Sequence, residues 1–395
     1  MNDTKTPLDR VPNADTLHVA QIFSAGTMKT LAEVIKPHLE VGKRKIVYIF
    51  PASDAIGHIS GEMHILWSLY GKEFDEILVV IGARHLSSMP DGPARVVNQY
   101  VTFVETDDSN VMLIGHFTAP PQDYGLFELK LTSSTGLCNI YYPSFLAKGI
   151  EQHFKLPPDM IEQGEAFLHS LGWRPSEKII PVHGRERTYL PSQRYHSLRS
   201  VRMAFYRPAI DHLLESGAWV FRLGDPNSTA LEHPANRFID LPHLSNYEDW
   251  MDVFLISRAY FSLNCSSGPA SYCQIFDVPS LLVNNVPQTF NLITPTHKHV
   301  YMFKNFRDVG SGELMSYSEI LDRDLSNFSQ TQEYETAGIQ VEENTADEIL
   351  EAVQEMEARL EGRHVEDRLL QDRFRKLSID YDRDRIQRIT GGTAP

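Results

Sequence analysis

The segment YFSLNCSSGPASYCQIFDVPSLLVNN, residues 260–285, predicts a strand, a helix and a second strand joined by short loops. Apolar runs at 260–264 and 279–285 are typical of buried strands. Pro269 suits the first turn of a helix over 268–277, because its missing N–H is not needed there. Two strands connected by a helix pair in parallel, so this segment alone predicts an α/β domain.

The same alternation precedes this segment and extends the predicted sheet. Strands are expected at 178–182 and 218–224, and helices at 208–217 and 248–259. Further on, Thr345 and Glu348 form the pattern of a capping box. They open a helix whose apolar stripe is Ile349, Val353, Met356 and Leu360, and Gly362 suits its end.

The first half of the chain predicts a second, similar domain. A strand at 43–50, a helix at 61–71 and a strand at 76–82 make a βαβ unit, hence another parallel sheet. Residues 98–142 look richer in strand. Residues 148–178 hold helical segments interrupted by Pro157 and Pro158 and end in a loop that suits a domain boundary.

At 395 residues the chain is too long for one ordinary core, so we expect at least two domains. The fold class predicted is α/β, with two parallel-sheet domains and C-terminal helices. The boundaries expected are a flexible arm at 1–17, an N-terminal domain at 18–170, a C-terminal domain at 171–340, and helices at 341–395 that pack across the domains.

Composition excludes several classes of protein. The formal net charge of −15 works against binding nucleic acid or an anionic membrane through the general surface, so we expect no nucleic-acid partner and at most peripheral membrane association. The N-terminus lacks the apolar core of a signal peptide, and no apolar run is long enough to span a membrane. We therefore expect a cytoplasmic protein. Cys138, Cys265 and Cys273 form no CxxC pair and are expected to be reduced.

The loop between the predicted strand and helix at 264–269 suits an anion. In parallel α/β sheets, ligands bind at the carboxyl ends of the strands. Ser266 and Ser267 offer hydroxyl and N–H groups there, Gly268 lets a ligand approach the backbone, and a helix N-terminus carries partial positive charge. The alternative is that Ser267 simply caps the helix, as serines before helices commonly do.

A cluster of arginines gives a second reason to expect an anion. Between His183 and Arg207 the sequence has one acidic residue, Glu186, no lysine, and six arginines at 185, 187, 194, 199, 202 and 207. Arg185 follows the strand 178–182 directly, and an arginine fork matches phosphate oxygens, so Arg185 and the Ser266–Gly268 loop are predicted to grip a diphosphate. For most of the other arginines, a solvated surface loop remains the alternative.

Several common motifs are absent from the sequence. It has no GxGxxG after a strand, no GxxxxGK[ST] and no GxSxG, which disfavours dinucleotide oxidoreductases, P-loop NTPases and serine hydrolases. DxD spacings occur at Asp322/Asp324 and at Asp380/Asp382/Asp384 and could hold a metal on a diphosphate. Solvated helix faces explain these aspartates more simply, so no metal site is predicted.

The residues above resemble a family of bacterial glycosyltransferases of surface polysaccharide synthesis, related to the GT-B heptosyltransferases and fucosyltransferases. The resemblance covers the second half well and the first half loosely. It is carried by VHGRE (182–186), ESGAWVFRLGDP (215–226), the segment 249–285, SYSEIL (316–321) and EILEAVQEMEARL (348–360).

The resemblance implies two Rossmann-like domains facing a cleft, with the nucleotide-sugar bound mainly by the second and the acceptor mainly by the first. His183-Gly184-Arg185 matches the HxR motif of the related fucosyltransferases, in which the arginine neutralises the donor diphosphate. ASDAIGH (52–58) is similar to the loop that carries the catalytic aspartate of heptosyltransferases. His58 stands at that place here.

Further site residues follow from this expectation. His58, with Glu62 one turn along, is the candidate general base, because histidine titrates near neutral pH. A polar residue at a helix start is the alternative for His58. Gly224 and Asp225, which follow a strand, are placed near the ribose or base together with Asn284 and Asn285, although Asp225 could equally form a turn before Pro226.

The function predicted is transfer of a hexose or deoxyhexose from a GDP- or UDP-sugar to a hydroxyl of a carbohydrate or glycolipid acceptor. The relatives imply inversion at the anomeric carbon, and the arginines imply that neither a metal nor another cofactor is needed. Two alternatives stay open: a nucleotide-sugar epimerase or hydrolase of the same fold, and a non-catalytic carbohydrate-binding protein.

Overall fold

The computed structural model describes residues 16–83, 89–148, 153–186, 197–287 and 298–390, and it divides into two compact units, 1–157 and 158–395. Most of the expected arm, residues 1–15, lies outside the described residues, and a helix begins at Thr16. The domain boundary was predicted at 170/171. Because the division falls after Pro157, helix α7 (Pro158–Ser170) belongs to the second unit.

The first unit is an α/β domain built on a five-stranded sheet in the order β3-β2-β1-β5-β4. The strands β1, β2, β3 and β5 run parallel, and β4 is antiparallel to β5. The elements are α1 (Thr16–Ile22), α2 (Ala25–Ile35), β1 (Lys45–Ile49), α3 (Ile56–Tyr70), β2 (Glu76–Gly82), α4 (Asp91–Val97), β3 (Thr102–Thr106), α5 (Ser109–Ile114), β4 (Gln122–Asp123), β5 (Phe127–Lys130) and α6 (Ser134–Lys148).

The predicted strands at 43–50 and 76–82 and the helix between them are confirmed. Residues 109–114 were expected in a strand-rich stretch and are helical instead. Asp108 explains the difference, since its carboxylate accepts from the N–H groups of Asn110 and Val111 (2.8 and 3.2 Å) and caps α5. Val111 and Ile114, three positions apart, are the buried residues of that helix.

The second unit contains a six-stranded, all-parallel sheet in the order β11-β10-β9-β6-β7-β8. Numbered from its first strand, this is the 3-2-1-4-5-6 order of the Rossmann fold. A two-stranded antiparallel ribbon, β12 with β13, follows. The elements after α7 are β6 (Ile179–His183), α8 (Arg207–Glu215), β7 (Trp219–Leu223), β8 (Phe238–Asp240), α9 (Trp250–Ser257), β9 (Ser262–Asn264), α10 (Ala270–Ile275), β10 (Ser280–Asn285), β11 (His299–Phe303), β12 (Asn305–Asp308), α11 (Tyr317–Asp322), α12 (Thr331–Thr336), β13 (Ile339–Glu342), α13 (Ala346–Leu360) and α14 (Arg368–Thr390).

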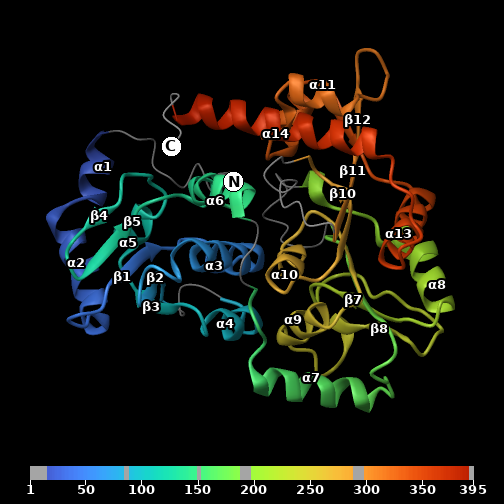
Figure 1. Ribbon diagram of the computed structural model, residues 1–395, viewed down its shortest axis with the longest axis horizontal. Coiled ribbons are helices and arrows are strands. Elements are labelled where there is room, and N and C mark those ends of the chain that lie inside the picture. The colour runs from blue at the N-terminus through green and yellow to red at the C-terminus, as the bar shows by residue number, and fades with distance from the viewer. Residues whose placement is uncertain (1–15, 84–88, 149–152, 187–196, 288–297, 391–395) are drawn as a thin grey trace, which may run out of the picture. The chain divides into compact units, whose positions relative to one another are not determined.

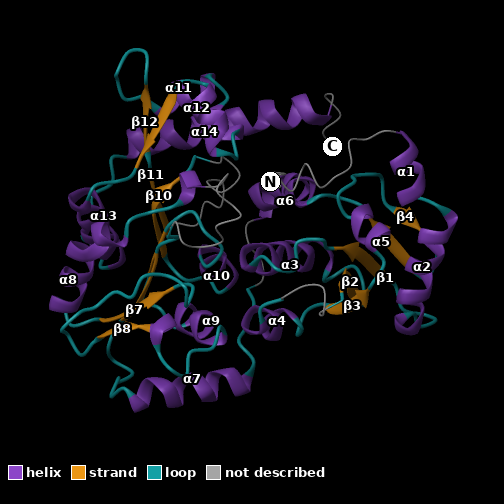
Figure 2. Ribbon diagram, turned by 180° about the vertical axis from the view of Figure 1, so that it is seen from behind, coloured by secondary structure: helices purple, strands orange, loops and turns teal. Residues whose placement is uncertain are grey.

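Helices cover both faces of this sheet. α8 and α13 lie side by side on one face (Figure 1), where Ile210, Leu213, Ile349 and Val353 join the strand residues in one core. On the other face, Phe167 of α7 meets Phe221 of β7, and α7 lies beside α9. The strands of the sheet are drawn in orange in Figure 2.

The C-terminal helices were expected to pack across the domains. α13 instead packs in the core of the second unit through Ile349, Val353 and Met356, and its capping box at Thr345 and Glu348 forms as predicted. α14 packs on α11, since Phe374 meets Tyr317 at 4.7 Å between ring centres and Ser378 bonds the Tyr317 hydroxyl at 3.0 Å.

Replacing two helical glycines by alanine is expected to change the free energy of unfolding in opposite directions. A Cβ on Gly164 of α7 would overlap the ring of Phe254 of α9, whereas a Cβ on Gly61 of α3 meets nothing within 4 Å. Gly164→Ala is therefore expected to lower the free energy of unfolding by about 1–3 kcal/mol despite the better helix propensity of alanine. Gly61→Ala is expected to raise it by up to about 1 kcal/mol. Urea unfolding of both variants tests this, and equal shifts would show that α7 does not press on α9.

Candidate anion site and candidate base

The candidate anion site lies at the switch point of the second-unit sheet, which is the place between β6 and β9 where the strand order reverses. β6 and β9 are neighbours, paired at Val182 and Leu263, while the chain between them runs out through β7 and β8 and back. The loops that leave β6 and β9 therefore start side by side at the carboxyl edge, the usual ligand position in such sheets. They are joined directly: the N–H of Arg185 donates to Sγ of Cys265 at 3.2 Å. Arg185 is thus bonded through its backbone to the residue that precedes Ser266.

The loop Ser266–Gly268 is not arranged as a simple helix cap. α10 begins at Ala270, its N-cap residue is Pro269, and no side chain caps it. Within the described chain, the hydroxyls of Ser266 and Ser267 form no hydrogen bond, and only Ser266 is buried. The alternative in which Ser267 caps the helix is therefore not observed. α10 is only six residues long, so its dipole is a weaker source of positive charge than predicted.

Positive side chains supply that charge instead. Nε of Arg199 donates to the carbonyl of Ser266 at 2.8 Å, and the buried Lys304 donates from Nζ to the carbonyl of Ser200 at 2.7 Å. Burial raises the pKa of the Cys265 thiol, and the cations Arg199, Lys304 and Arg185 act in the opposite direction, which places their charges around the end of β9. Three cationic side chains therefore lie together at the switch point of an acidic protein.

His183 is the last residue of β6, directly before Gly184, and is buried. Burial lowers the pKa of His183 to about 4, with Arg222, Arg185 and Arg199 adding to the effect and the backbone of Leu223 partly opposing it. Neither ring nitrogen has a well-aligned hydrogen-bond partner in the part of the chain that the structure describes. His183 is thus neutral at pH 7 and adds a hydrogen-bonding group, not a charge.

Arg222 of β7, which sequence reasoning missed, joins the loops after β6 and β7 to the last residue of β8. Its guanidinium donates to Glu186 (2.7 Å), Ser228 (2.7 Å) and Asp240 (2.8 Å), and it is 1% exposed. Because Glu186 follows Arg185 in the chain, these hydrogen bonds hold the start of the loop that leaves β6. An arginine at the centre of an apolar strand, VFRL, was the signal available in the sequence.

Arg222→Met is expected to lower the free energy of unfolding by about 2–3 kcal/mol, because it leaves the carboxylates of Glu186 and Asp240 without their cationic partner. The loss is limited because both carboxylates are partly exposed to solvent. Urea unfolding measures this. Arg307→Met is the matched control: Arg307 forms a two-armed pair with Glu342 but is about one-third exposed, so less than about 1 kcal/mol is expected. Equal losses in the two variants would contradict a buried anchor.

The residues predicted near the ribose or base have different surroundings. Asp225 closes a turn: its Oδ1 accepts from the backbone and side chain of Asn227 (2.7 and 2.8 Å), as in the turn alternative. Gly224, with φ +152°, precedes it. Asn284 is fully buried and exchanges backbone and side-chain hydrogen bonds with Asn344 (2.6 and 2.7 Å), which hold its side-chain oxygen within the core.

Asn285 behaves differently from its neighbour. It is 1% exposed at the carboxyl end of β10, and neither atom of its amide has a hydrogen-bond partner among the described residues. Its carbonyl accepts from the N–H of Lys304 at 2.9 Å, so Asn285 adjoins one of the three cationic residues. Asn285 stays a candidate contact for the ligand.

The remaining arginines of the cluster divide into two groups. Arg187 and Arg194 lie outside the described residues. Arg202 pairs with Glu343 at 3.2 Å and Arg207 with Asp211 at 3.0 Å, both on the surface, as the alternative for these arginines stated.

The candidate base lies in the first unit, at the switch point between β1 and β5 where the strand order of that sheet reverses. β1 is flanked by β2 and β5, and the chain returns to β5 after making β3. His58 is in the first turn of α3, after β1, and Ser134 begins α6, after β5. The Ser134 hydroxyl lies 3.3 Å from Nδ1 of His58. Nδ1 is also 2.6 Å from Oε1 of Glu62, so the predicted pair of His58 and Glu62 is in contact.

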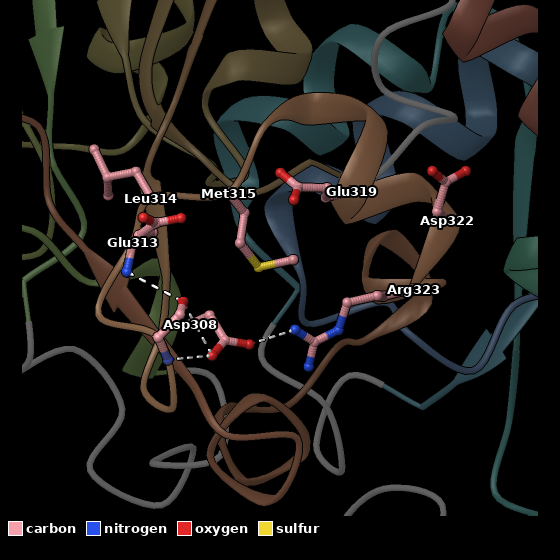
Figure 3. A pocket seen from close by; sticks show the side chains of 8 residues that line it. Asp308, Glu313, Leu314, Met315, Glu319, Asp322 and Arg323 are labelled. Atoms are coloured by element: carbon pink, nitrogen blue, oxygen red, sulfur yellow. Dashed lines mark hydrogen bonds and ion pairs between the residues drawn. The ribbon is translucent and has the colours of Figure 1, made fainter.

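A separate open hollow of about 190 Å³ lies between the β12 turn and α11 (Figure 3). Acidic side chains line it, including Asp322 of the first DxD, and Arg323 pairs with Asp308 across it at 2.7 Å. Asp324 bonds the Tyr381 hydroxyl, and Asp380 pairs with Lys376 and Arg383. Within the described ranges, no group of three or more histidine, cysteine or acidic side chains is gathered as in a metal site.

Comparisons with known proteins give the following matches. No protein-family model matches the chain, and no curated protein is significantly similar to it. Among solved structures, "The crystal structure of the glycosyl transferase family 9 from Veillonella parvula DSM 2008" aligns with a TM-score of 0.42 at 10% identity, covering 80% of this chain and 97% of that chain. The dodecameric iron-containing heptosyltransferase TibC, in complex with ADP-D-beta-D-heptose, aligns with a TM-score of 0.38 at 10% identity, covering 80% and 77%. At these scores the likeness assigns no activity.

Taken by themselves, the two sites have distinct chemical capacities. The switch point of the second unit presents cations, hydroxyls and buried amide and imidazole groups, which suit an anion with several oxygens. The switch point of the first unit presents a half-exposed histidine backed by a buried carboxylate, which suits removal of a proton. Among the described helices, none is both long and apolar enough to span a bilayer.

Proposed function

We propose that this chain is a glycosyltransferase that moves a sugar from a nucleotide diphosphate sugar to a hydroxyl of a carbohydrate acceptor. The observation that carries the proposal is the Rossmann switch point of the second unit, where the Arg185 loop and the Ser266–Gly268 loop are joined and positive charge gathers. That arrangement supports binding of a diphosphate at the place where such sheets bind ligands. The family resemblance supports surface glycan or polysaccharide synthesis.

In the proposed site, the second unit binds the donor. Arg185, Arg199 and Lys304 face the negative charge of the diphosphate, and Ser266, Ser267 and Gly268 offer donors to its oxygens. His183 and Asn285 are buried, and the polar atoms of their side chains have no well-aligned partner among the described residues. These two side chains are proposed as neutral hydrogen-bonding groups for the donor. Asn284 takes no part, and Asp225 shapes the turn after β7.

In the proposed reaction, His58 takes the proton of the acceptor hydroxyl. The acceptor oxygen forms a bond to the anomeric carbon while the bond from that carbon to the phosphate oxygen breaks, and the nucleoside diphosphate leaves with the electron pair. Cations at the leaving group stabilise the charge that develops there. Attack opposite the leaving group inverts the anomeric carbon, and the arginines can neutralise a GDP or UDP leaving group without a metal.

The experiment that tests this function is thermal unfolding of the full chain with UDP, GDP, ADP and CMP and their sugars, with and without Mg²⁺. A nucleotide at about 100 times its Kd is expected to add about 2.7 kcal/mol of stability, and one nucleoside diphosphate should do so without Mg²⁺. Stabilisation by none of them would contradict a nucleotide site. Full-rate turnover of the nucleotide-sugar without an acceptor would contradict transfer and point to an epimerase or hydrolase.

A further inference from the structure

A continuous line of hydrogen bonds runs from the sheet of the first unit to its surface. Tyr48 of β1 is 1% exposed, and its hydroxyl donates to Oε2 of Glu62 at 2.8 Å. Glu62 is 4% exposed, and its other oxygen, Oε1, lies 2.6 Å from Nδ1 of His58. The His58 side chain is 49% exposed. The line therefore begins in the core and ends on the group that we propose as the base.

The protons along this line have one consistent arrangement. Burial, and next the negative charge of Glu62, raise the pKa of Tyr48 far above its usual value, so the phenol keeps its proton and donates. With Oε2 occupied in this way, Oε1 of the carboxylate accepts from Nδ1–H of His58. The neutral ring then carries its basic lone pair on Nε2.

We propose that Tyr48 is a positioning residue for His58: it holds Glu62 in the orientation that keeps the proton of the imidazole on Nδ1 and leaves Nε2 as the base. This inference rests on the proposed role of His58. Tyr48 touches no reacting atom and acts through Glu62 alone. A buried carboxylate with two hydrogen-bond donors, one from a strand and one from its own helix, cannot rotate, so the imidazole is fixed as well.

Groups from each neighbouring element fit this arrangement. From α6, the Ser134 hydroxyl at 3.3 Å can share the Nδ1–H of His58 as a second, longer acceptor, and Cys138 adds to the rise in the pKa of Tyr48. From α3 itself, Glu62 is the charged partner of His58, and from β1 it is Tyr48 that reaches the carboxylate. A change at Tyr48 therefore reaches His58 through the charge of Glu62.

Two substitutions are expected to shift the titration of His58 in opposite directions. Tyr48→Phe removes a donor from the carboxylate, which concentrates the negative charge of Glu62 on Oε1 and is expected to raise the pKa of His58 by about half a unit. Glu62→Gln removes the charge and is expected to lower that pKa by about 1–2 units. If His58 is the base, the acid limb of the pH profile of kcat/KM shifts in each variant in the same direction as the pKa of His58, upward in Tyr48→Phe and downward in Glu62→Gln.

The experiment is a pH titration of the full chain by ¹H–¹⁵N correlation of the histidine rings, with His58→Gln to assign the signal. The wild type is expected to show the Nδ1–H tautomer, Tyr48→Phe the upward shift with loss of the single tautomer, and Glu62→Gln the downward shift. Tyr70→Phe, on the same helix, is the control and should leave the His58 signal unchanged, because the pKa of Tyr70 is raised by burial and by Glu128 and Glu73, away from Glu62.

The outcomes separate this inference from the proposed function. A wild-type His58 in the Nε2–H tautomer, or a Tyr48→Phe titration equal to the wild type, would overturn the role of Tyr48 even if the chain transfers sugar. Shifts as expected in a chain that binds no nucleotide-sugar would support the role of Tyr48 and contradict the glycosyltransferase. The wild-type tautomer alone decides the matter if the Tyr48→Phe chain does not fold.

Discussion

Arg185→Ala is expected to lower kcat/KM for the nucleotide-sugar about a thousand-fold. The guanidinium is the proposed clamp on the diphosphate, and removing a preorganised group that stabilises developing charge commonly costs about 10²–10³ in rate, with weaker ground-state binding in addition. Nucleoside diphosphate binding should weaken about 30-fold, because a charge-assisted hydrogen bond contributes about 2 kcal/mol. Steady-state kinetics and calorimetric titration with the nucleoside diphosphate measure the two effects.

The matched control for Arg185 is Arg202→Gln. Arg202 belongs to the same arginine cluster, but it is exposed and pairs with Glu343. Its loss should leave Kd and kcat/KM within about twofold of the wild type, as is usual for a surface pair. Arg185→Lys should fall between the two, because it keeps the charge and loses the fork. An Arg185→Ala chain that binds the nucleotide as the wild type does would remove Arg185 from the site.

His58→Ala is expected to lower kcat about 10²–10⁴-fold while nucleotide binding stays unchanged. A positioned general base contributes about this much, and His58 lies in the first unit whereas the donor cations lie in the second. The measurement is single-turnover transfer at saturating donor, together with the Kd of the nucleoside diphosphate. A loss of the transfer rate with an unchanged Kd identifies a role in the chemistry, because a misfolded chain would lose both transfer and binding.

His169→Ala provides the comparison for His58. It is an exposed histidine on α7 whose ring centre lies 6.1 Å from that of Trp173, so its loss should change neither kcat nor Kd by more than about twofold. If His58→Ala transfers sugar at the wild-type rate, the first-unit histidine has no part in the chemistry and the line from Tyr48 is structural.

The sequence predicted the sheets because strand and helix periodicities were strong and local. Apolar strands such as 76–82 and 279–285 and the Thr345–Glu348 capping box leave little choice of conformation. The segment 109–114 was misjudged because its apolar run of four residues, 111–114, suits either a strand or a buried helix, and the Asp108 cap decided the conformation. α7 packs on the second unit through contacts such as Gly164 with Phe254 and Phe167 with Phe221, which are tertiary contacts that no local pattern carries.

The candidate site was predictable where it follows from strand ends, and not where it depends on long-range partners. Arg185 and the Ser266–Gly268 loop follow β6 and β9, so parallel pairing alone brings them together. Lys304 was missed because it approaches through β11, far along the chain. Asn284 and Asn285 are adjacent in sequence and look equivalent there, yet Asn344, sixty positions away, engages only the first.

The most direct test of the central claim is a crystal structure of the full chain with the nucleoside diphosphate that stabilises it. The account predicts that the diphosphate lies at the carboxyl edge of the second-unit sheet, in contact with the guanidinium of Arg185 and with the loop Ser266–Gly268 between β9 and α10. A diphosphate bound elsewhere, for example in the hollow beside Arg323, would contradict it.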